Sequence, residues 1–282
     1  MALSRCVMFD TLQKPQPLDQ WVAEALANPM PQFLLPGFIP AQGLVIIAGR
    51  PKLAKKSWFA YASAMTLASG VSYGPFQPSR RANVLFYSRE GAPGPIANRF
   101  LLLEKGMGIS LSKCDNLYWV QNGGVFLDEP NHVKQICKTI EELDIECTYW
   151  DTFARSFRGD ENSARDVGAA LRGVEKLRDA GSASVLVHHL GKSEKPTLGG
   201  TPDPDAGLRG SSALAGAYDN IVNIQQLEID GASESWAIVG GKYLDFHAYR
   251  QEWEIDESVA RLLLDGPQDL PVIDAPQQRV RF

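Results

Sequence analysis

The chain has 282 residues, a formal net charge of −5 and 44% hydrophobic residues. This length allows one large α/β domain or two small ones, and the composition is that of an ordinary globular protein. The negative charge argues against a surface broadly coated for nucleic acid, although a local basic loop or the central channel of an oligomer could still bind it.

The ends and the cysteines indicate the compartment. No apolar stretch approaches the roughly 18–20 residues of a membrane span, and the first residues lack the basic-then-apolar pattern of a secretion signal. The cysteines show no metal-ligand spacing, and Cys147 lies within an apolar run. Reduced, partly buried thiols are therefore expected, in a cytoplasmic protein without membrane association.

Residues 1–42 are expected to form a lead-in segment. A short amphipathic helix is predicted over Leu18–Ala27. Pro31, Pro36 and Pro40 follow it and predict an extended or turning connection.

From residue 43, apolar runs alternate with helical patterns. The expected strands are Gly43–Ala48, Ala82–Ser88, Leu117–Val120, Glu146–Trp150 and Ala183–His188. The expected helices are Ser57–Ala68, Ala97–Gly106, Asn131–Leu143 and Ala164–Ala180. This alternation predicts an α/β fold, with a mostly parallel sheet flanked by helices and a ligand site at the carboxyl ends of the strands.

The pattern changes after residue 190. Gly191–Gly207 is rich in Gly and Pro and is expected to be a mobile loop. Ile221–Leu227, Glu234–Val239 and Tyr249–Ile255 read as short strands of a C-terminal antiparallel extension. The main domain is thus predicted over residues 43–256, and residues 257–282 are expected to be a flexible tail.

The segment between the first strand and its helix resembles a phosphate-binding loop. It reads Gly49, Arg50, Pro51, Lys52, Leu53, Ala54, Lys55, Lys56 and Ser57. Such loops use glycines so that backbone N–H groups face phosphates, a lysine for the β/γ-phosphates and a hydroxyl for Mg²⁺. The alternative is a basic turn that opens an amphipathic helix.

Two registers of this loop are possible. Counted from Gly49, Ala54 takes the place of the second glycine and Lys55 that of the lysine. Counted from Ser57, Lys56 and Ser57 fall correctly, but Arg50 and Lys55 replace the glycines. In that register Lys55 would need a left-handed or otherwise strained backbone.

Two acidic residues follow predicted strands. Asp151 ends an apolar strand and is followed by Thr152, the arrangement of a Walker B aspartate that orients Mg²⁺. Glu90 follows Ser88-Arg89, where a carboxylate could orient and deprotonate an attacking water. The alternatives are a helix-capping or turn aspartate and a solvated turn glutamate.

Basic residues complete the candidate site. His188 and His189 lie at the end of the predicted strand Ala183–His188. Because side chains alternate along a strand, one histidine is expected to pack in the core and the other to face the site, where it could sense a γ-phosphate. Arg209 follows the predicted mobile loop. It is either a surface charge or an arginine finger that reaches a neighbouring subunit's phosphate.

The order of these motifs resembles the RepA-like AAA ATPases of the RecA/DnaB superfamily, which include hexameric plasmid replicative helicases. The similarity covers roughly residues 33–245 and rests on the motifs that begin at Gly49, Ser88, Trp150, Gly159, His188 and Arg209.

The resemblance implies a RecA-like core that uses ATP and Mg²⁺ in a homo-hexamer acting in plasmid or phage DNA replication. Lys56 or Lys55 would contact phosphates, Ser57 and Asp151 would hold Mg²⁺, and Glu90 would be the catalytic carboxylate. One of the two histidines would be the sensor, with His189 preferred, and Arg209 would be the finger.

The resemblance also makes Lys242 a basic residue that reaches a neighbour's nucleotide. Tyr243-Leu244 replace the more basic pairing often found beside that lysine. The loops after the predicted strands Glu146–Trp150 and Ala183–His188 would grip single-stranded DNA in the channel of the ring, using basic residues such as Arg155. Two other functions stay open: a non-catalytic nucleotide-binding oligomer with a degenerate loop, and a KaiC-like or recombinase-like regulatory ATPase.

Overall fold

The computed structural model describes residues 16–27, 32–190, 197–198, 201–205, 207–208, 212–269 and 271. The chain divides into two compact units, Met1–Gln32 and Phe33–Phe282. In the first unit, α1 (Leu18–Ala27) confirms the predicted helix, and its apolar side chains Trp21 and Leu26 are exposed. Within the described residues, no helix combines the length and apolar character needed to cross a bilayer.

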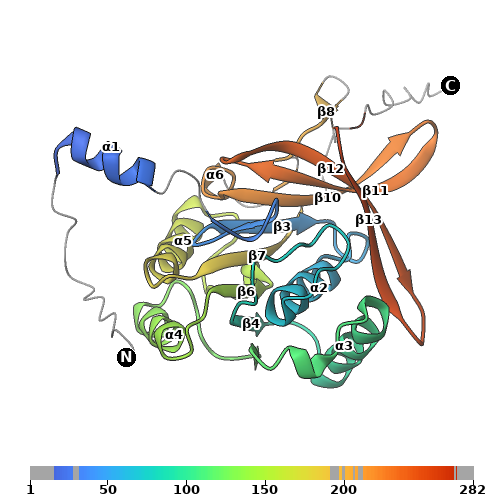
Figure 1. Ribbon diagram of the computed structural model, residues 1–282, viewed down its shortest axis with the longest axis horizontal. Helices are drawn as coiled ribbons and strands as arrows, with labels where there is room; N and C mark the ends of the chain where they lie inside the picture. Colours follow the sequence, from blue (N-terminus) through green and yellow to red (C-terminus); the bar gives the residue numbers. More distant parts are fainter. Residues whose placement is uncertain are drawn as a thin grey trace. The chain divides into compact units, whose positions relative to one another are not determined.

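The second unit is built on a sheet whose order is β13-β12-β11-β10-β3-β7-β6-β4-β5 (Figure 1). The strands are β3 (Leu44–Gly49), β4 (Val84–Ser88), β5 (Leu117–Gln121), β6 (Cys147–Asp151), β7 (Ala183–His189), β10 (Asn220–Ile229), β11 (Ala232–Gly241), β12 (Leu244–Ile255) and β13 (Ala260–Gln268). The strands from β10 to β5 pair in parallel, whereas β11, β12 and β13 continue the sheet antiparallel. The predicted α/β class and its antiparallel extension are confirmed.

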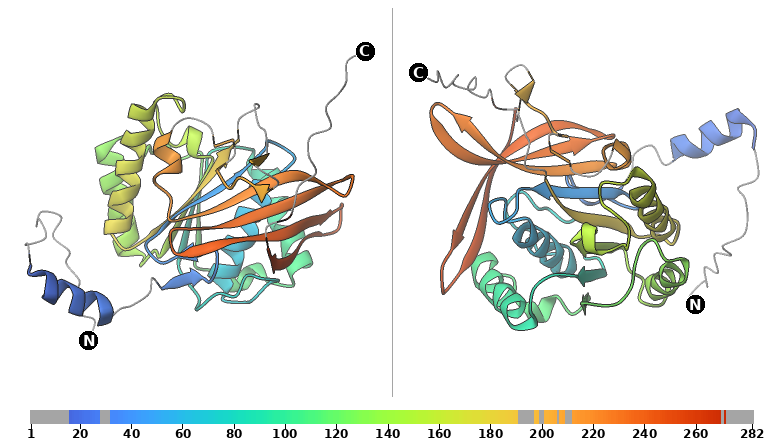
Figure 2. Two further views of the ribbon diagram at one scale, coloured as in Figure 1. Left: turned by 90° about the horizontal axis from the view of Figure 1, so that it is seen from above. Right: turned by 180° about the vertical axis from the view of Figure 1, so that it is seen from behind.

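Helices cover both faces of the parallel part of the sheet (Figure 2). They are α2 (Lys56–Ser69), α3 (Pro93–Met107), α4 (Pro130–Glu142), α5 (Ala164–Asp179) and the short α6 (Ser212–Ala215), with 3-10 turns η1 (Leu111–Lys113) and η2 (Phe153–Arg155). One core cluster joins α2 and α3 to the sheet, and a second joins α4 and α5 to its other face. The sheet is therefore the middle of three layers.

The central strand β3 shows why this sheet forms. All six of its residues are buried, and successive side chains enter opposite layers. Val45 and Ile47 pack in the cluster with α2, whereas Ile46 and Ala48 pack in the cluster with α5. The strand ends at Gly49, where a side chain would collide with Ala54 of the following loop. The sequence thus directs the chain from a buried strand into a tight loop and then into α2.

Two regions differ from the prediction. The second unit begins at Phe33 rather than at residue 43, because β1 (Phe33–Leu35) and β2 (Ile39–Pro40) form a hairpin whose apolar side chains are largely buried. The expected mobile loop contains a short antiparallel pair, β8 (Thr197–Leu198) and β9 (Thr201–Pro202).

Strand β13 lies in the segment that was expected to be a flexible tail. It pairs with β12, and Leu262 is buried. A side chain at Gly106 of α3 would collide with the backbone of Ala260, so helix and strand are in close contact. The Gly266-Pro267 sequence suggested a tail, but the apolar residues before it are held by this packing.

Candidate active site

The candidate residues of the parallel strands meet at one edge because those strands are neighbours in the sheet. Gly49 at the end of β3 pairs with His189 of β7. Asp151 of β6 lies beside Val187 of β7 on one side and beside Ser88 of β4 on the other. The loop after β3, the end of β6 and the turn after β4 therefore form a single site.

The loop after β3 has an irregular backbone. Lys52 and Lys55 have φ values of 65° and 53°, in the left-handed region that favours glycine. Lys55 precedes the first residue of α2, and its side chain is exposed. The strained backbone expected for Lys55 is present, which favours the register in which Lys56 and Ser57 occupy the lysine and hydroxyl positions.

Lys56 is the buried cation of this loop, with 5% of its surface exposed. Its Nζ donates hydrogen bonds to the carbonyl oxygens of Gly49, at 2.7 Å, and Arg50, at 3.3 Å. Burial lowers the pKa of Lys56 to about 8, an effect that the charges of Asp151 and Glu90 partly offset. The amine is thus held at the centre of the loop, where a phosphate could exchange with the carbonyls.

Asp151 is also buried, with 2% of its surface exposed. Ser57 donates a hydrogen bond to its carboxylate, and the hydroxyl of Tyr61 lies 3.5 Å from Oδ2. Burial raises the pKa of Asp151 to about 6. Among the described residues, its Oδ1 atom has no hydrogen-bond partner.

These two residues fit a divalent cation. The unpartnered Oδ1 of Asp151 and the hydroxyl of Ser57 are hard oxygen donors on adjacent elements. In the described part of the chain, no group of three His, Cys, Asp or Glu side chains could hold a metal alone. Mg²⁺ suits such a site, since it usually keeps several waters and substrate phosphates beside one or two protein ligands.

Glu90 is held by contacts that converge on one oxygen. Its Oε1 accepts a hydrogen bond from Thr152 Oγ1 at 3.2 Å, and Arg155 Nε lies 3.1 Å away. His189 Nε2 is 4.0 Å from the same oxygen. His189, Arg155 and Thr152 together hold the pKa of Glu90 below its usual range, against the effect of burial.

The two histidines separate as alternation predicts. His188 is buried with its ring against Phe153, whereas His189 is partly exposed beside Glu90. The geometry therefore favours His189 as the residue that could sense a phosphate. Arg209, the predicted finger, lies outside the described residues.

Lys242 lies at the amino end of the parallel strands, whereas the phosphate loop of the same chain lies at their carboxyl end. It follows β11, whose last residue Gly241 pairs with Asn220 at the start of β10. Its Nζ contacts Asp219 Oδ1 at 3.1 Å and the carbonyl oxygen of Ala217 at 3.4 Å.

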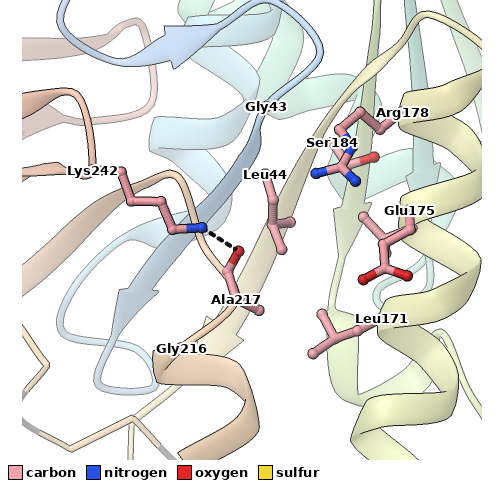
Figure 3. A pocket seen from close by; sticks show the side chains of 10 residues that line it. Gly43, Leu44, Leu171, Glu175, Arg178, Ser184, Gly216, Ala217 and Lys242 are labelled. Carbon is pink, nitrogen blue, oxygen red and sulfur yellow. Dashed lines mark hydrogen bonds between the residues drawn. The ribbon is translucent and has the colours of Figure 1, made fainter. Parts of the chain in front are cut away.

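A pocket of about 230 Å³ lies beside Lys242, between the start of β3 and α5 (Figure 3). Arg178 and Glu175 from α5 and Ser184 at the start of β7 also line it. Lys242 and this pocket thus lie at the amino end of the parallel strands, away from the phosphate loop of the same chain.

Tyr61 was not foreseen as part of the site, and Thr152 and Arg155 were not foreseen as partners of Glu90. Tyr61 follows Ser57 by four residues, so helical periodicity places both on one face of α2 and could have indicated it. The contacts of Thr152 and Arg155 with Glu90 span more than 60 residues of sequence and depend on the pairing of β4 with β6.

Comparisons with known proteins agree with this architecture. A family model described as AAA domain matches residues 11–195, which include the loop after β3, Glu90, Asp151 and His189. No curated protein matches the chain. Among solved structures, a KaiC-like protein from the hyperthermophilic archaeon Pyrococcus horikoshii OT3 superposes with a TM-score of 0.55 and 13% sequence identity. The match covers 84% of this chain and 96% of that chain.

At this identity the structural likeness shows the fold alone. That fold is the RecA-like core of P-loop ATPases, a group that generally uses ATP and Mg²⁺. The family model covers well over half of the chain and ends beyond the last strand of the candidate site. The chain belongs to the AAA domain family.

Proposed function

We propose that this protein binds ATP with Mg²⁺ and hydrolyses it at the carboxyl edge of β3, β7, β6 and β4. The observation that carries the proposal is the convergence of Lys56, Asp151, Glu90 and His189 at this one edge. A buried amine, a buried carboxylate with a vacant acceptor atom and a second carboxylate are the groups that phosphoryl transfer to water requires.

Each group has a distinct task in this proposal. Lys56 neutralises charge on the β- and γ-phosphates after it leaves the carbonyl of Gly49. Asp151 and Ser57 hold Mg²⁺, which supplies charge neutralisation across the phosphates. Glu90 orients and deprotonates the attacking water, and His189 reports the state of the γ-phosphate.

The proposed assembly is a ring, with a hexamer as the expected size. The position of Lys242 supports a ring, because it lies at the end of the parallel strands opposite the phosphate loop of its own chain, where a neighbour's nucleotide could reach it. Arg209 is proposed as the finger at the same junction. In a ring each junction joins the loop edge of one subunit to the Lys242 edge of the next, a heterologous contact that closes on itself.

For the work done with ATP, we propose translocation on single-stranded DNA, as a helicase-type motor in plasmid or phage replication. The support is the order of motifs, together with Arg89 and Arg155 beside the loop after β6. Arg158 of that loop is less available, because it is paired with Asp128 and Glu129.

A KaiC-like regulatory ATPase that does not translocate is the second candidate. The KaiC-like fold of the solved archaeal structure and the partly neutralised loop after β6 favour it. A nucleotide-binding oligomer without catalysis is the third, and the strained Lys55 in a position that normally holds glycine favours that one.

Phosphate release from ATP tests the proposal, measured with Mg²⁺ or with EDTA and with or without oligothymidylate. Turnover that needs Mg²⁺ is expected, and it should be abolished in Lys56→Ala and Asp151→Asn while both variants stay folded. Full activity in both variants would remove the assigned site. Absence of turnover in every condition would leave the non-catalytic oligomer. Turnover without strand displacement would leave the KaiC-like candidate.

A further inference from the structure

Two hydroxyl groups from one face of α2 contact the buried aspartate of the site. Ser57 and Tyr61 are four residues apart in this helix, so their side chains lie on the same face. Ser57 donates a hydrogen bond to the Asp151 carboxylate, and the hydroxyl oxygen of Tyr61 lies 3.5 Å from Asp151 Oδ2. The other carboxylate oxygen, Oδ1, is buried and has no hydrogen-bond partner among the described residues. The two oxygens of this carboxylate are therefore unequal.

The ring of Tyr61 is fixed by other aromatic side chains. Only 1% of the residue is exposed. Its ring stacks on Phe100 of α3, with the centroids 5.0 Å apart, and meets Phe86 of β4 and Trp119 of β5 edge-on at 5.3 and 5.8 Å. Close-packed aromatic contacts leave the phenol few alternative positions. The hydroxyl is thus held at one point beside Asp151.

The neighbours of the Tyr61 hydroxyl decide where its proton goes. Arg99 of α3 and Ser88 of β4 also form hydrogen bonds with it. Arginine carries only donors, so Arg99 uses the hydroxyl oxygen as an acceptor and leaves the proton for another group. The acceptors beside it are Asp151 Oδ2 and Ser88 Oγ, whose own proton is donated to the carbonyl oxygen of Glu90. The carboxylate is the stronger of the two acceptors because it is charged.

We propose that Tyr61 positions Asp151 for the metal: its hydroxyl, with Arg99 behind it, holds Oδ2 so that only Oδ1 is offered to the cation. Tyr61 is a positioning residue in this proposal, since it acts through Asp151 and contacts neither the metal nor ATP. The inference rests on the proposed binding of Mg²⁺ by Asp151 and Ser57.

A carboxylate held in this way discriminates between cations. Ca²⁺ accepts a flexible set of oxygens and often takes both oxygens of one carboxylate, whereas Mg²⁺ demands near-ideal octahedral geometry with few protein ligands. Because the Tyr61 hydroxyl occupies Oδ2, Asp151 offers one oxygen rather than two. Tyr61 therefore favours Mg²⁺ over Ca²⁺ at this site.

Tyr149 provides a matched control. It is also buried, lies on β6 two residues before Asp151, and stacks on the same Phe86 with the centroids 5.2 Å apart. Its hydroxyl, however, pairs with Ser63 Oγ at 3.0 Å. Tyr61→Phe and Tyr149→Phe therefore each remove one buried hydroxyl from the same core cluster and keep the ring. Only the first removes a contact of the metal-binding aspartate.

The experiment uses the full chain bound to adenylyl imidodiphosphate, an ATP analogue that is not hydrolysed. Electron paramagnetic resonance of free Mn²⁺ gives the dissociation constant for Mn²⁺, and competition gives those for Mg²⁺ and Ca²⁺. For Tyr61→Phe we expect the Mg²⁺ affinity to fall about tenfold, the lower end for losing a partner of a metal ligand, since the contact is long. The Ca²⁺ affinity should fall less. ATP affinity in EDTA should be unchanged, because Lys56 and its loop are intact.

Arg99 tests the contact behind the hydroxyl. Its guanidinium also packs over the ring of Trp58, 5.4 Å from the centroid, so Arg99→Met keeps an apolar side chain there and removes the donor. The Mg²⁺ affinity should fall in Arg99→Met, but by less than in Tyr61→Phe. In the double variant the two losses should not add, because Arg99 acts through the hydroxyl. Additive losses would overturn the role of Arg99.

Tyr149→Phe should keep the wild-type affinities for both cations, and thermal melting shows that each variant folds. Equal Mg²⁺ affinities of Tyr61→Phe and Tyr149→Phe would overturn the inference, as would an unchanged ratio of the Mg²⁺ and Ca²⁺ affinities. An equal loss of ATP affinity in EDTA would also overturn it, since Tyr61 would then support the whole site. If the wild type binds metal with the analogue and the tyrosine variants behave alike, only this inference fails. If the wild type binds no metal with the analogue, the proposed function fails with it.

Discussion

Lys56 closes the phosphate loop on itself, because its Nζ donates a hydrogen bond to the carbonyl oxygen of Gly49 at 2.7 Å. The neighbouring Lys55 has an exposed side chain and a left-handed backbone. Two adjacent lysines thus differ in burial, in partners and in backbone conformation. Substituting each of the two lysines in turn therefore distinguishes the lysine that binds phosphate from the lysine that is only part of the loop.

The first prediction compares Lys56→Ala with Lys55→Ala. Loss of the buried amine should lower turnover by roughly 100-fold or more, because a preorganised charge at the phosphates is removed. Loss of the exposed amine should have a much smaller effect. Phosphate release and calorimetric ATP binding measure both, with thermal melting to show that each variant folds. Equal losses in the two variants would contradict the assignment of Lys56.

The second prediction concerns the strain at Lys55. In Lys55→Gly the backbone φ of 53° is no longer unfavourable, so the folded state should gain roughly 1 kcal/mol. Lys55→Ala removes the same charge but keeps the strain, so it should not be stabilised. Denaturant unfolding at one pH compares them. Equal stabilities would mean that charge, not backbone strain, governs this position.

The sequence anticipated β3, β4, β6 and β7 well because each is a short, mostly apolar run that is buried on both faces, as in Leu44–Gly49. It anticipated the positions of Asp151 and Glu90 because polar residues that end such strands must share one edge. The strand order that makes β6 the neighbour of both β4 and β7 is not written in any local pattern. It decides that Arg155 meets Glu90.

Long-range packing also explains what the sequence did not reveal. β13 has no strong strand signal of its own, but its pairing with β12 and the close approach of Gly106 to Ala260 fix it. The position of Lys242 follows from the antiparallel return of β11, which carries the chain back to the edge where β10 begins. Such features become visible only when partners distant in sequence are known.

The third prediction is that Asp151→Asn stabilises the nucleotide-free protein. Burial raises the pKa of Asp151 from 3.8 to about 6, so its carboxyl contributes full stability below about pH 4 and loses it as the pH rises to about 6. Above that pH the ionised form costs roughly 3 kcal/mol. The melting temperature of the variant should exceed that of the wild type by several degrees at pH 8 and by less at pH 5. A lower melting temperature at pH 8 would show that the carboxylate is better satisfied than its buried Oδ1 indicates.

The fourth prediction follows from the same groups in the presence of ligands. Mg²⁺ binds the ionised carboxylate, so the affinity for Mg²⁺ should fall as the pH drops through about 6, the pKa of Asp151. ATP measured in EDTA depends instead on protonated Lys56, whose pKa is about 8. Bound phosphates raise that pKa, so metal-free ATP affinity should decline only at or above about pH 8. Calorimetric titrations across this pH range measure both the Mg²⁺ affinity and the metal-free ATP affinity. In Lys56→Ala the decline of ATP affinity at alkaline pH should be absent.

The last prediction tests whether Lys242 serves a neighbour. Lys56→Ala and Lys242→Ala should each have little activity alone, because every site in either ring lacks one of the two cations. In an equal mixture, a subunit with an intact Lys56 can receive an intact Lys242 from a neighbour of the other type. Random assembly makes roughly a quarter of the sites complete, so turnover should return to about that fraction of the wild type.

This recovery depends on geometry that no folded single chain can supply. Lys242 lies at the edge where β10 begins, whereas Lys56 follows the end of β3, which runs parallel to β10. The mixture is measured after the subunits have been allowed to exchange, and a mixture of Lys56→Ala with Asp151→Asn serves as the control. Those two substitutions affect the same edge of one subunit, so the control should recover no activity. Recovery in both mixtures, or full activity of Lys242→Ala alone, would show that Lys242 does not act across a junction between subunits.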